Sequence, residues 1–430
     1  MRIVMLTNDT KNKLMNDLLK RATDDYSEQE SVVKVIIKDI HDRRDDALFE
    51  YTKKFDKAEL NADNIRVTPD EIEAAYEEVN EELITVIRKA ISNIKTFHEK
   101  QKRNSWITTE DNGVILGQRI LPLESVGVYV PGGKAAYPST VLMNVIPAKV
   151  AGVERIVMTT PCNAEGKVYP TTLVAANEAG VTDIFKVGGA QAIAALAYGT
   201  ESVPKVDKIV GPGNIFVAIA KRLVYGHVSI DSIAGPSEIL VLADETANPE
   251  YVAADLLSQA EHDELASATL VTTSEELAIE VSKWVDTFTA KLERKDIIQK
   301  SIDNFGNIFV AKDMNDAIDA ANEIAPEHLE IITKNPWETM TKVKNAGAIF
   351  LGEYSSEPLG DYFAGPNHVL PTNGTARFFS PLNVDDFVKK SSIINYNEEA
   401  LRAVHEDIEL FAKAEGLTAH ANSIAVRFKG

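Results

Sequence analysis

The sequence has little cysteine and a deficit of positive charge. Cys162 is the only cysteine among 430 residues, which excludes an intramolecular disulfide and a multi-cysteine zinc site. Nothing around it supplies a base, so we expect a structural or incidental role. Lysine and arginine number 45 against 65 aspartate and glutamate residues, a formal net charge of -20. Such a charge repels nucleic-acid phosphates and anionic membrane surfaces, so neither is an expected partner.

Long hydrophobic runs are also missing. No window approaches the roughly 18 consecutive apolar residues that a membrane-spanning helix needs. The first apolar stretch, MRIVML, is broken by polar residues before it reaches the length of a secretory signal. We therefore expect a cytoplasmic protein, in a compartment where a lone thiol stays reduced.

What the sequence does contain is the composition of a globular chain, with 44% hydrophobic and 26% charged residues. Residues 1–105 are predicted to be helical, because apolar residues recur at spacings of three and four. From Leu121 onward, short β-branched runs alternate with alanine-rich helical patterns, which indicates βαβ units and parallel sheets. The predicted strands are 126–130, 155–160, 183–187, 207–210, 238–244, 268–273, 307–311, 328–332 and 347–352.

We predict an α/β fold with two incomplete Rossmann-like domains, 106–236 and 237–380, after the helical region and before a helical tail, 381–430. Neither α/β part contains the Gly-x-Gly-x-x-Gly turn that seats a dinucleotide in an ordinary Rossmann unit. The nearest match, in residues 187–199, has the wrong spacing. The residues alone therefore do not predict a nicotinamide cofactor.

A candidate metal site lies on the helix predicted to begin at Asn248 and Pro249, a side-chain cap followed by proline. Gln259 and His262 are three residues apart on it, so both side chains project from one face. Imidazole nitrogen and amide oxygen can both bind Zn²⁺, although glutamine is an uncommon ligand. The alternative is a solvated helix face.

An acid and a base, Glu327 and His328, follow a helical pattern and precede an apolar run. Histidine is the usual base for removing a hydroxyl proton, and a neighbouring carboxylate can activate water. These roles suit oxidation chemistry. Alternatively, Glu327 caps a turn and His328 is a satisfied buried histidine.

Residues 352–382 are rich in glycine, proline and asparagine and are too long for an ordinary connection, as functional loops often are. Asp361 and His368 are its candidate ligands or bases, unless they fix turns through local hydrogen bonds. Glu415 and His420 lie near the end of a predicted helix, where such residues are more often surface caps than a site.

Eight motifs, in order, resemble the histidinol dehydrogenase family over about residues 30–430. They are VGVYVPGGKAAYPSTVLMNVIPAKVAGV, VGGAQAIAALAYGT, IVGPGN, DSIAGPSEILVLAD, LLSQAEHD, APEHLEI, LGDYFAGPNHVLPTNGTAR and EGLTAHANSI. The family oxidises L-histidinol to L-histidine with two NAD⁺ in succession and one zinc ion.

The resemblance implies roles for matching residues. The implied zinc ligands are Gln259, His262, Asp361 and His420, and the implied catalytic pair is Glu327 and His328. The implied cofactor contacts are Tyr129, Gln191 and Asn214. The implied substrate contacts are Ser237, Gln259, His262, His328, Asp361, Glu415 and His420. The resemblance also implies a homodimer with shared active sites, in which the C-terminal tail brings Glu415 and His420 to the partner's site.

Three other functions stay open at this point. A paralogue of the same fold would oxidise a different alcohol, but the retention of Glu415 and His420 argues against it. A zinc hydrolase would activate water without a redox cofactor, which the three cofactor matches disfavour. In a non-catalytic two-lobed binding protein, the acid and base would be superfluous.

Overall fold

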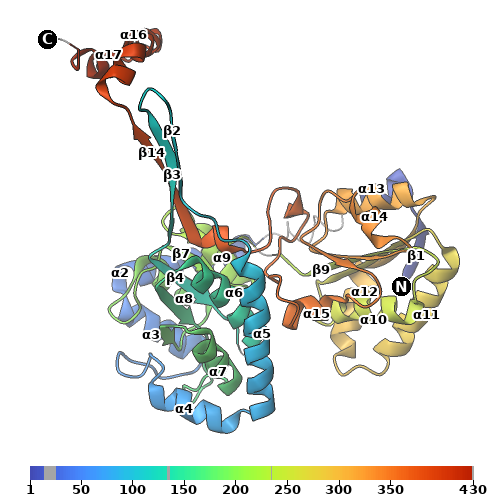
Figure 1. Ribbon diagram of the computed structural model, residues 1–430. Helices are drawn as coiled ribbons and strands as arrows, with labels where there is room; N and C mark the ends of the chain where they lie inside the picture. The colour runs from blue at the N-terminus through green and yellow to red at the C-terminus, as the bar shows by residue number, and fades with distance from the viewer. Residues whose placement is uncertain (14–25, 133–135, 234, 429–430) are drawn as a thin grey trace. The chain divides into compact units, whose positions relative to one another are not determined.

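The computed structural model describes residues 1–13, 26–132, 136–233 and 235–428 (Figure 1). They form two compact units: unit 1 is Met1–Gln101 with Leu123–Phe387, and unit 2 is Lys102–Pro122 with Val388–Gly430. Residues 133–135 of the first motif lie outside the described residues. Within the described ranges, no helix is long and apolar enough to cross a membrane. The predicted domain limits at residues 105, 236 and 380 stay predictions.

The first sheet of unit 1 is parallel, with the strand order β6-β5-β4-β7-β8. The chain adds β5 and β6 on one side of β4 and then crosses over to add β7 and β8 on the other. This reversal creates a switch point between β4 and β7, where open parallel sheets bind ligands at the carboxyl ends of their strands. The strands are β4 (Ser125–Tyr129), β5 (Arg155–Thr159), β6 (Asp183–Phe185), β7 (Lys208–Val210) and β8 (Ser229–Ile230), and the helices between them are α6 (Pro138–Ala151), α7 (Pro170–Ala179), α8 (Gly189–Tyr198) and α9 (Ile215–Val224).

N-terminal helices share the hydrophobic core of this first sheet. In α2, buried residues at Val33, Ile36 and Ile40 recur at spacings of three and four, so one face packs inward. The other face is mostly polar and charged, although Val32 and Val35 are exposed on it. The capping box of Thr68 and Glu71 fixes the start of α4. The helices are α2 (Ser27–Arg43), α3 (Asp45–Phe55), α4 (Pro69–Glu78) and α5 (Glu81–Glu99).

The second sheet of unit 1 is also parallel, in the order β1-β11-β10-β9-β12-β13. Leaving β1 aside, it reverses at β9 just as the first sheet reverses at β4. Its strands are β1 (Arg2–Met5), β9 (Glu238–Ala243), β10 (Ser267–Thr272), β11 (Gly306–Val310), β12 (His328–Ile332) and β13 (Ala348–Leu351). The prediction of helix over residues 1–105 is wrong at β1, because pairing with the distant β11 decides the structure of this short stretch.

Helices cover both faces of the second sheet. In β9, Ile239 and Val241 join one core cluster, and Leu240 and Leu242 join another. Full burial contributes about 1.5–3 kcal/mol for each such side chain, and a strand buried on both faces has a continuous apolar sequence. The helices are α10 (Pro249–Ala260), α11 (Glu275–Thr289), α12 (Lys295–Phe305), α13 (Met314–Ile324) and α14 (Pro336–Met340). All nine predicted strands are confirmed, as is the predicted α/β fold.

Unit 2 is an antiparallel sheet of β14 (Val388–Asn395), β3 (Ile115–Pro122) and β2 (Trp106–Thr109), followed by α16 (Glu398–Ala414) and α17 (Thr418–Ala425). The prediction that the tail, residues 381–430, is helical is wrong at β14, which pairs with β3 along its whole length. Its sequence, VKKSSIIN, has no strong local preference, and the partner strand determines its structure.

Candidate active site

The candidate catalytic residues meet at the amino edge of the second sheet. Glu238 and His328 are the first residues of β9 and β12, which are neighbouring strands. Helices of βαβ units run antiparallel to the strands, so α10 ends near this same edge, with Gln259 in its last turn and His262 just beyond. This edge is opposite the one at which open parallel sheets usually bind ligands.

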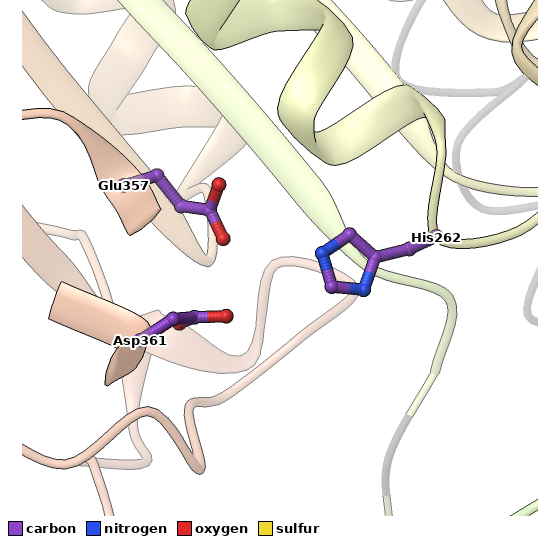
Figure 2. Close-up of side chains that lie close together, drawn as sticks. All are labelled: His262, Glu357 and Asp361. Carbon is purple, nitrogen blue, oxygen red and sulfur yellow. The ribbon is translucent and has the colours of Figure 1, made fainter. Parts of the chain in front are cut away.

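Three side chains there form a cluster that fits a cation. His262, Glu357 and Asp361 each offer a ligand atom, and these atoms lie within 4.8 Å of one another. Glu357 and Asp361 are four residues apart on the short helix α15 (Glu357–Tyr362), so both face His262 (Figure 2). Surrounding protein atoms remove part of the hydration of His262 and lower its pKa, which favours the neutral imidazole that binds metals.

Gln259 supplies a second sign that these residues fit a cation. Its side chain is 1% exposed, and its Oε1 has no hydrogen-bond partner among the described residues. Leaving a buried amide oxygen unsatisfied costs about 1–3 kcal/mol. A cation bound by Gln259 together with His262 would remove that cost.

Glu327 and His328 form a buried acid–base pair, 6% and 4% exposed. The Glu238 backbone N–H donates to Glu327 Oε2 at 2.9 Å, and His328 Nδ1 lies 3.0 Å from the Glu238 carbonyl oxygen and 3.8 Å from Glu327 Oε2. Burial raises the pKa of Glu327 to about 8. Burial opposes the charging of His328, but Glu327 and the nearby Asp361 outweigh it and raise the pKa of this imidazole.

Asp361 connects the pair to the cation-binding cluster. Its Oδ1 lies 3.9 Å from His328 Nε2 and 3.8 Å from His368 Nδ1. Burial opposes ionisation of Asp361, but His328 and His368 outweigh it and lower the pKa of this carboxyl. Asn367, beside His368, donates from Nδ2 to the Met143 carbonyl oxygen at 2.6 Å and so anchors this segment to α6.

Glu357 was missed by the sequence analysis, as were the residues that hold it. Ser258 Oγ donates to Glu357 Oε2 at 2.7 Å, and the Glu357 N–H donates to Glu330 Oε1 at 2.8 Å. Burial raises the pKa of Glu357 to about 7. One signal was present, the spacing of four between Glu357 and Asp361, but residues 352–382 were expected to be a single loop. The structure has helix α15 there.

Of the remaining predicted residues, Ser237 lies at this same amino edge and the others lie elsewhere. Ser237 directly precedes β9, and its carbonyl oxygen accepts the Ser267 N–H at 3.0 Å. Tyr129 ends β4, Gln191 lies in the first turn of α8 and Asn214 caps α9, so these three are at the carboxyl edge of the first sheet. Glu415 and His420 are exposed residues of unit 2. The roles expected for these residues stay predictions.

The fold and the site together define a class of α/β enzyme. Its two parallel sheets share the same reversal of strand order. A buried acid–base pair lies beside a cluster of imidazole and carboxylate groups at the edge of the second.

Comparison with known proteins identifies the family. The sequence pattern of histidinol dehydrogenase matches residues 19–428. Histidinol dehydrogenase of Halalkalibacterium halodurans is 60% identical over 412 residues, 96% of this chain and 97% of that protein. That of Clostridium acetobutylicum is 58% identical over 417 residues, covering 97% and 96%. A crystal structure of histidinol dehydrogenase from Elizabethkingia anophelis has a TM-score of 0.93 at 40% identity and covers 100% of this chain and 98% of that one. The chain belongs to the histidinol dehydrogenase family, which confirms the resemblance seen in the sequence.

Proposed function

We propose that this protein oxidises L-histidinol to L-histidine with NAD⁺, the last steps of histidine biosynthesis. The family match over nearly the whole chain supports this activity. The observation that carries it is the buried pair of Glu327 and His328, 3.8 Å apart, beside the cluster of His262 and Asp361. Alcohol oxidation needs a base for the hydroxyl proton, and oxidation of the resulting aldehyde needs a water molecule.

The hydrogen bonds of His328 suit it to the role of base. Its Nδ1 faces the Glu238 carbonyl oxygen at 3.0 Å, and a carbonyl can only accept, so Nδ1 carries the proton in the neutral ring. Nε2 then has a free lone pair, and it has no hydrogen-bond partner among the residues that the structure describes. His328 therefore takes the hydroxyl proton while hydride passes to the first NAD⁺, which leaves an aldehyde and NADH.

Glu327 suits the second step. The Glu238 N–H holds its Oε2, and the environment that raises the pKa of this carboxyl makes it a stronger base once it is ionised. It removes a proton from water as the water adds to the aldehyde. The hydrate then gives hydride to a second NAD⁺ and becomes the carboxylic acid, so each histidinol yields two NADH.

A zinc ion fits the residues of the cluster. Gln259, His262 and Asp361 would hold it, His420 would be a fourth ligand, and Glu357 adds a carboxylate that the sequence analysis did not foresee. When bound, zinc would orient the imidazole and amine of histidinol. The unsatisfied Oε1 of Gln259 is the main support for this assignment.

NAD⁺ is proposed to bind at the switch point of the first sheet. Tyr129 ends β4, and Asn214 follows β7, the strand across the point where the order reverses. Gln191 in α8 is 1% exposed, with an Oε1 that has no partner among the described residues. The strand order thus supports cofactor binding without the usual glycine pattern.

The test is an assay of NADH absorbance with purified protein, zinc, NAD⁺ and histidinol. We expect about two NADH per histidinol consumed, and His262→Ala should lose metal and activity together while keeping its fold. A preference for another alcohol would indicate the paralogue. Folded, metal-loaded protein that forms no NADH would refute the proposal and leave a hydrolase to be tested.

We further propose a homodimer with shared sites. Unit 2 exposes large apolar side chains that a partner would cover: Trp106, Ile107, Ile394, Leu410 and Phe411, between 51% and 73% exposed. Two inactive variants, His262→Ala and His420→Ala, give a sharp test when they are co-expressed. If the tail serves the partner's site, each mixed dimer has one intact site, and activity returns to about a quarter of wild type. If each chain uses its own tail, no activity returns.

A cytoplasmic location is also proposed. The single, buried thiol of Cys162 is compatible with a reducing compartment and requires no oxidising one. Fractionation of the producing cells, followed by immunodetection, tests this location. Recovery outside the cytoplasm would contradict it.

A further inference from the structure

A loop of unusual geometry crosses the carboxyl edge of the first sheet. Gly211, the residue after β7, has a φ of 113°, which side chains rarely adopt. A Cβ at this position would lie 2.0 Å from the Tyr129 carbonyl oxygen. The loop therefore passes in direct contact with the end of β4, and only glycine fits there.

A buried ion pair holds both polar groups of the Gly211 backbone. The Gly211 N–H donates to Asp231 Oδ2 at 2.8 Å, and Lys221 Nζ donates to the Gly211 carbonyl oxygen at 2.8 Å. Lys221 also pairs with Asp231, and the two side chains are 3% and 4% exposed. The pair joins α9, the loop after β7 and the residue after β8 at one point.

Stability alone does not explain this pair. Removing two charges from water is expensive, and well-packed apolar residues of similar size are often as stable or more so. What the pair does provide is a fixed backbone position for Gly211. Asn214, three residues later, accepts the N–H groups of Phe216 and Val217 at 3.0 and 3.2 Å and so starts α9, the helix that carries Lys221.

We propose that Lys221 and Asp231 are positioning residues for the nicotinamide cofactor. By holding Gly211, they fix the loop of residues 211–214, which contacts Tyr129 and ends at Asn214. The binding site at the switch point of the first sheet is thereby ordered before the dinucleotide arrives. The inference rests on the proposed function, which places NAD⁺ at this edge. Neither residue takes part in the chemistry at Glu327 and His328.

Lys221→Met tests the role, because it keeps most of the length of the unbranched side chain and removes its charge. We expect KM for NAD⁺ and Kd for NADH to rise about tenfold or more, since a misplaced loop must be ordered when the cofactor binds. The kcat at saturating NAD⁺ and KM for histidinol should change by less than about threefold, since the chemistry lies elsewhere. Lys221→Arg, which keeps the charge, should recover most of the affinity.

The matched control is Lys208→Met. Lys208 begins β7, the strand that ends just before Gly211, is 6% exposed and pairs with Asp386 at 3.1 Å. It does not bond the loop. This control removes the ion pair of a buried lysine on the strand before Gly211, so its stability should fall while its KM for NAD⁺ stays at the wild-type value.

The outcomes separate the two proposals. If the Lys221→Met and wild-type proteins have the same KM for NAD⁺ and Kd for NADH, positioning is refuted while the proposed function stands. If wild-type protein binds no NADH, both fail. Should Lys221→Met not fold, Asp231→Asn keeps an acceptor for the Gly211 N–H but loses the charge, and it should still weaken NADH binding more than Lys208→Met does.

Discussion

Replacing Glu327 by glutamine should abolish most of the activity and at the same time stabilise the metal-free protein. The amide keeps an acceptor for the Glu238 N–H that now reaches Oε2 at 2.9 Å, so the local geometry survives. It cannot accept a proton from water, and loss of a positioned base lowers the rate by about 10²–10⁴-fold.

The stability gain follows from the raised pKa of Glu327, about 8 in the folded protein against 4.5 for a glutamate carboxyl free in water. Between these values the folded protein keeps a proton that the unfolded chain has released. As far as Glu327 determines it, the free energy of unfolding is therefore highest below pH 4.5, and it declines as pH rises towards 8. At pH 7 the decline is about 3 kcal/mol, at about 1.4 kcal/mol per pH unit. The glutamine variant avoids it, less the part that the Glu327 charge returns by favouring the charged imidazole of His328.

The assay is urea unfolding of chelator-treated protein at pH 5 and pH 7.5, with Glu353→Gln as the control because Glu353 is exposed. The difference between the Glu327→Gln and wild-type proteins should be small at pH 5 and large at pH 7.5. A difference that does not depend on pH would refute the assignment of a buried, strongly perturbed carboxyl. A variant that oxidises histidinol at the wild-type rate would refute the catalytic role.

Three further substitutions test other features. Gln259→Leu should weaken zinc binding about tenfold or more in competition with a chromophoric chelator; unchanged affinity would exclude Gln259 as a ligand. Burial raises the pKa of Asp56 to about 6, so its ionisation costs stability increasingly from pH 3.8 to 6. Asp56→Asn should then be more stable at pH 7 by about 1–2 kcal/mol, allowing for partial solvent screening, and equal urea midpoints would contradict this. Burial raises the pKa of Cys162 to about 11, so the native thiol should resist alkylation by iodoacetamide at pH 8. The Cys162→Ala variant should keep its activity. An inactive variant would indicate that the thiol takes part in the reaction.

Much of unit 1 could be predicted from the sequence because its signals are local. A strand buried on both faces, such as β9, is a continuous apolar run, and Asn248 with Pro249 marks the start of α10. The strands β1 and β14 were missed because each pairs with a strand far away in the sequence. The hairpin strands β2 and β3 and the two-residue β8 were missed as well. Local patterns do not encode the distant pairing of β1 and β14.

The site residues, too, could be predicted only in part. Gln259 and His262 could be paired by their helical spacing, and Glu327 and His328 by adjacency. Their convergence at one edge depends on the order of the strands, which no single motif contains. Glu357 was missed because a helix of six residues, within a segment dense in glycine and proline, has too few turns to show a period.

The pairing of β3 with β14 has a consequence for folding during synthesis. At about 5–20 residues per second, the ribosome needs roughly tens of seconds after making β3 before β14 emerges. Throughout that time β3 has only β2 beside it, and one of its edges presents free N–H and C=O groups to any other extended chain. The nascent protein thus exposes an aggregation-prone strand edge until β14 has been made. Truncated chains that stop before Val388 would expose this edge permanently.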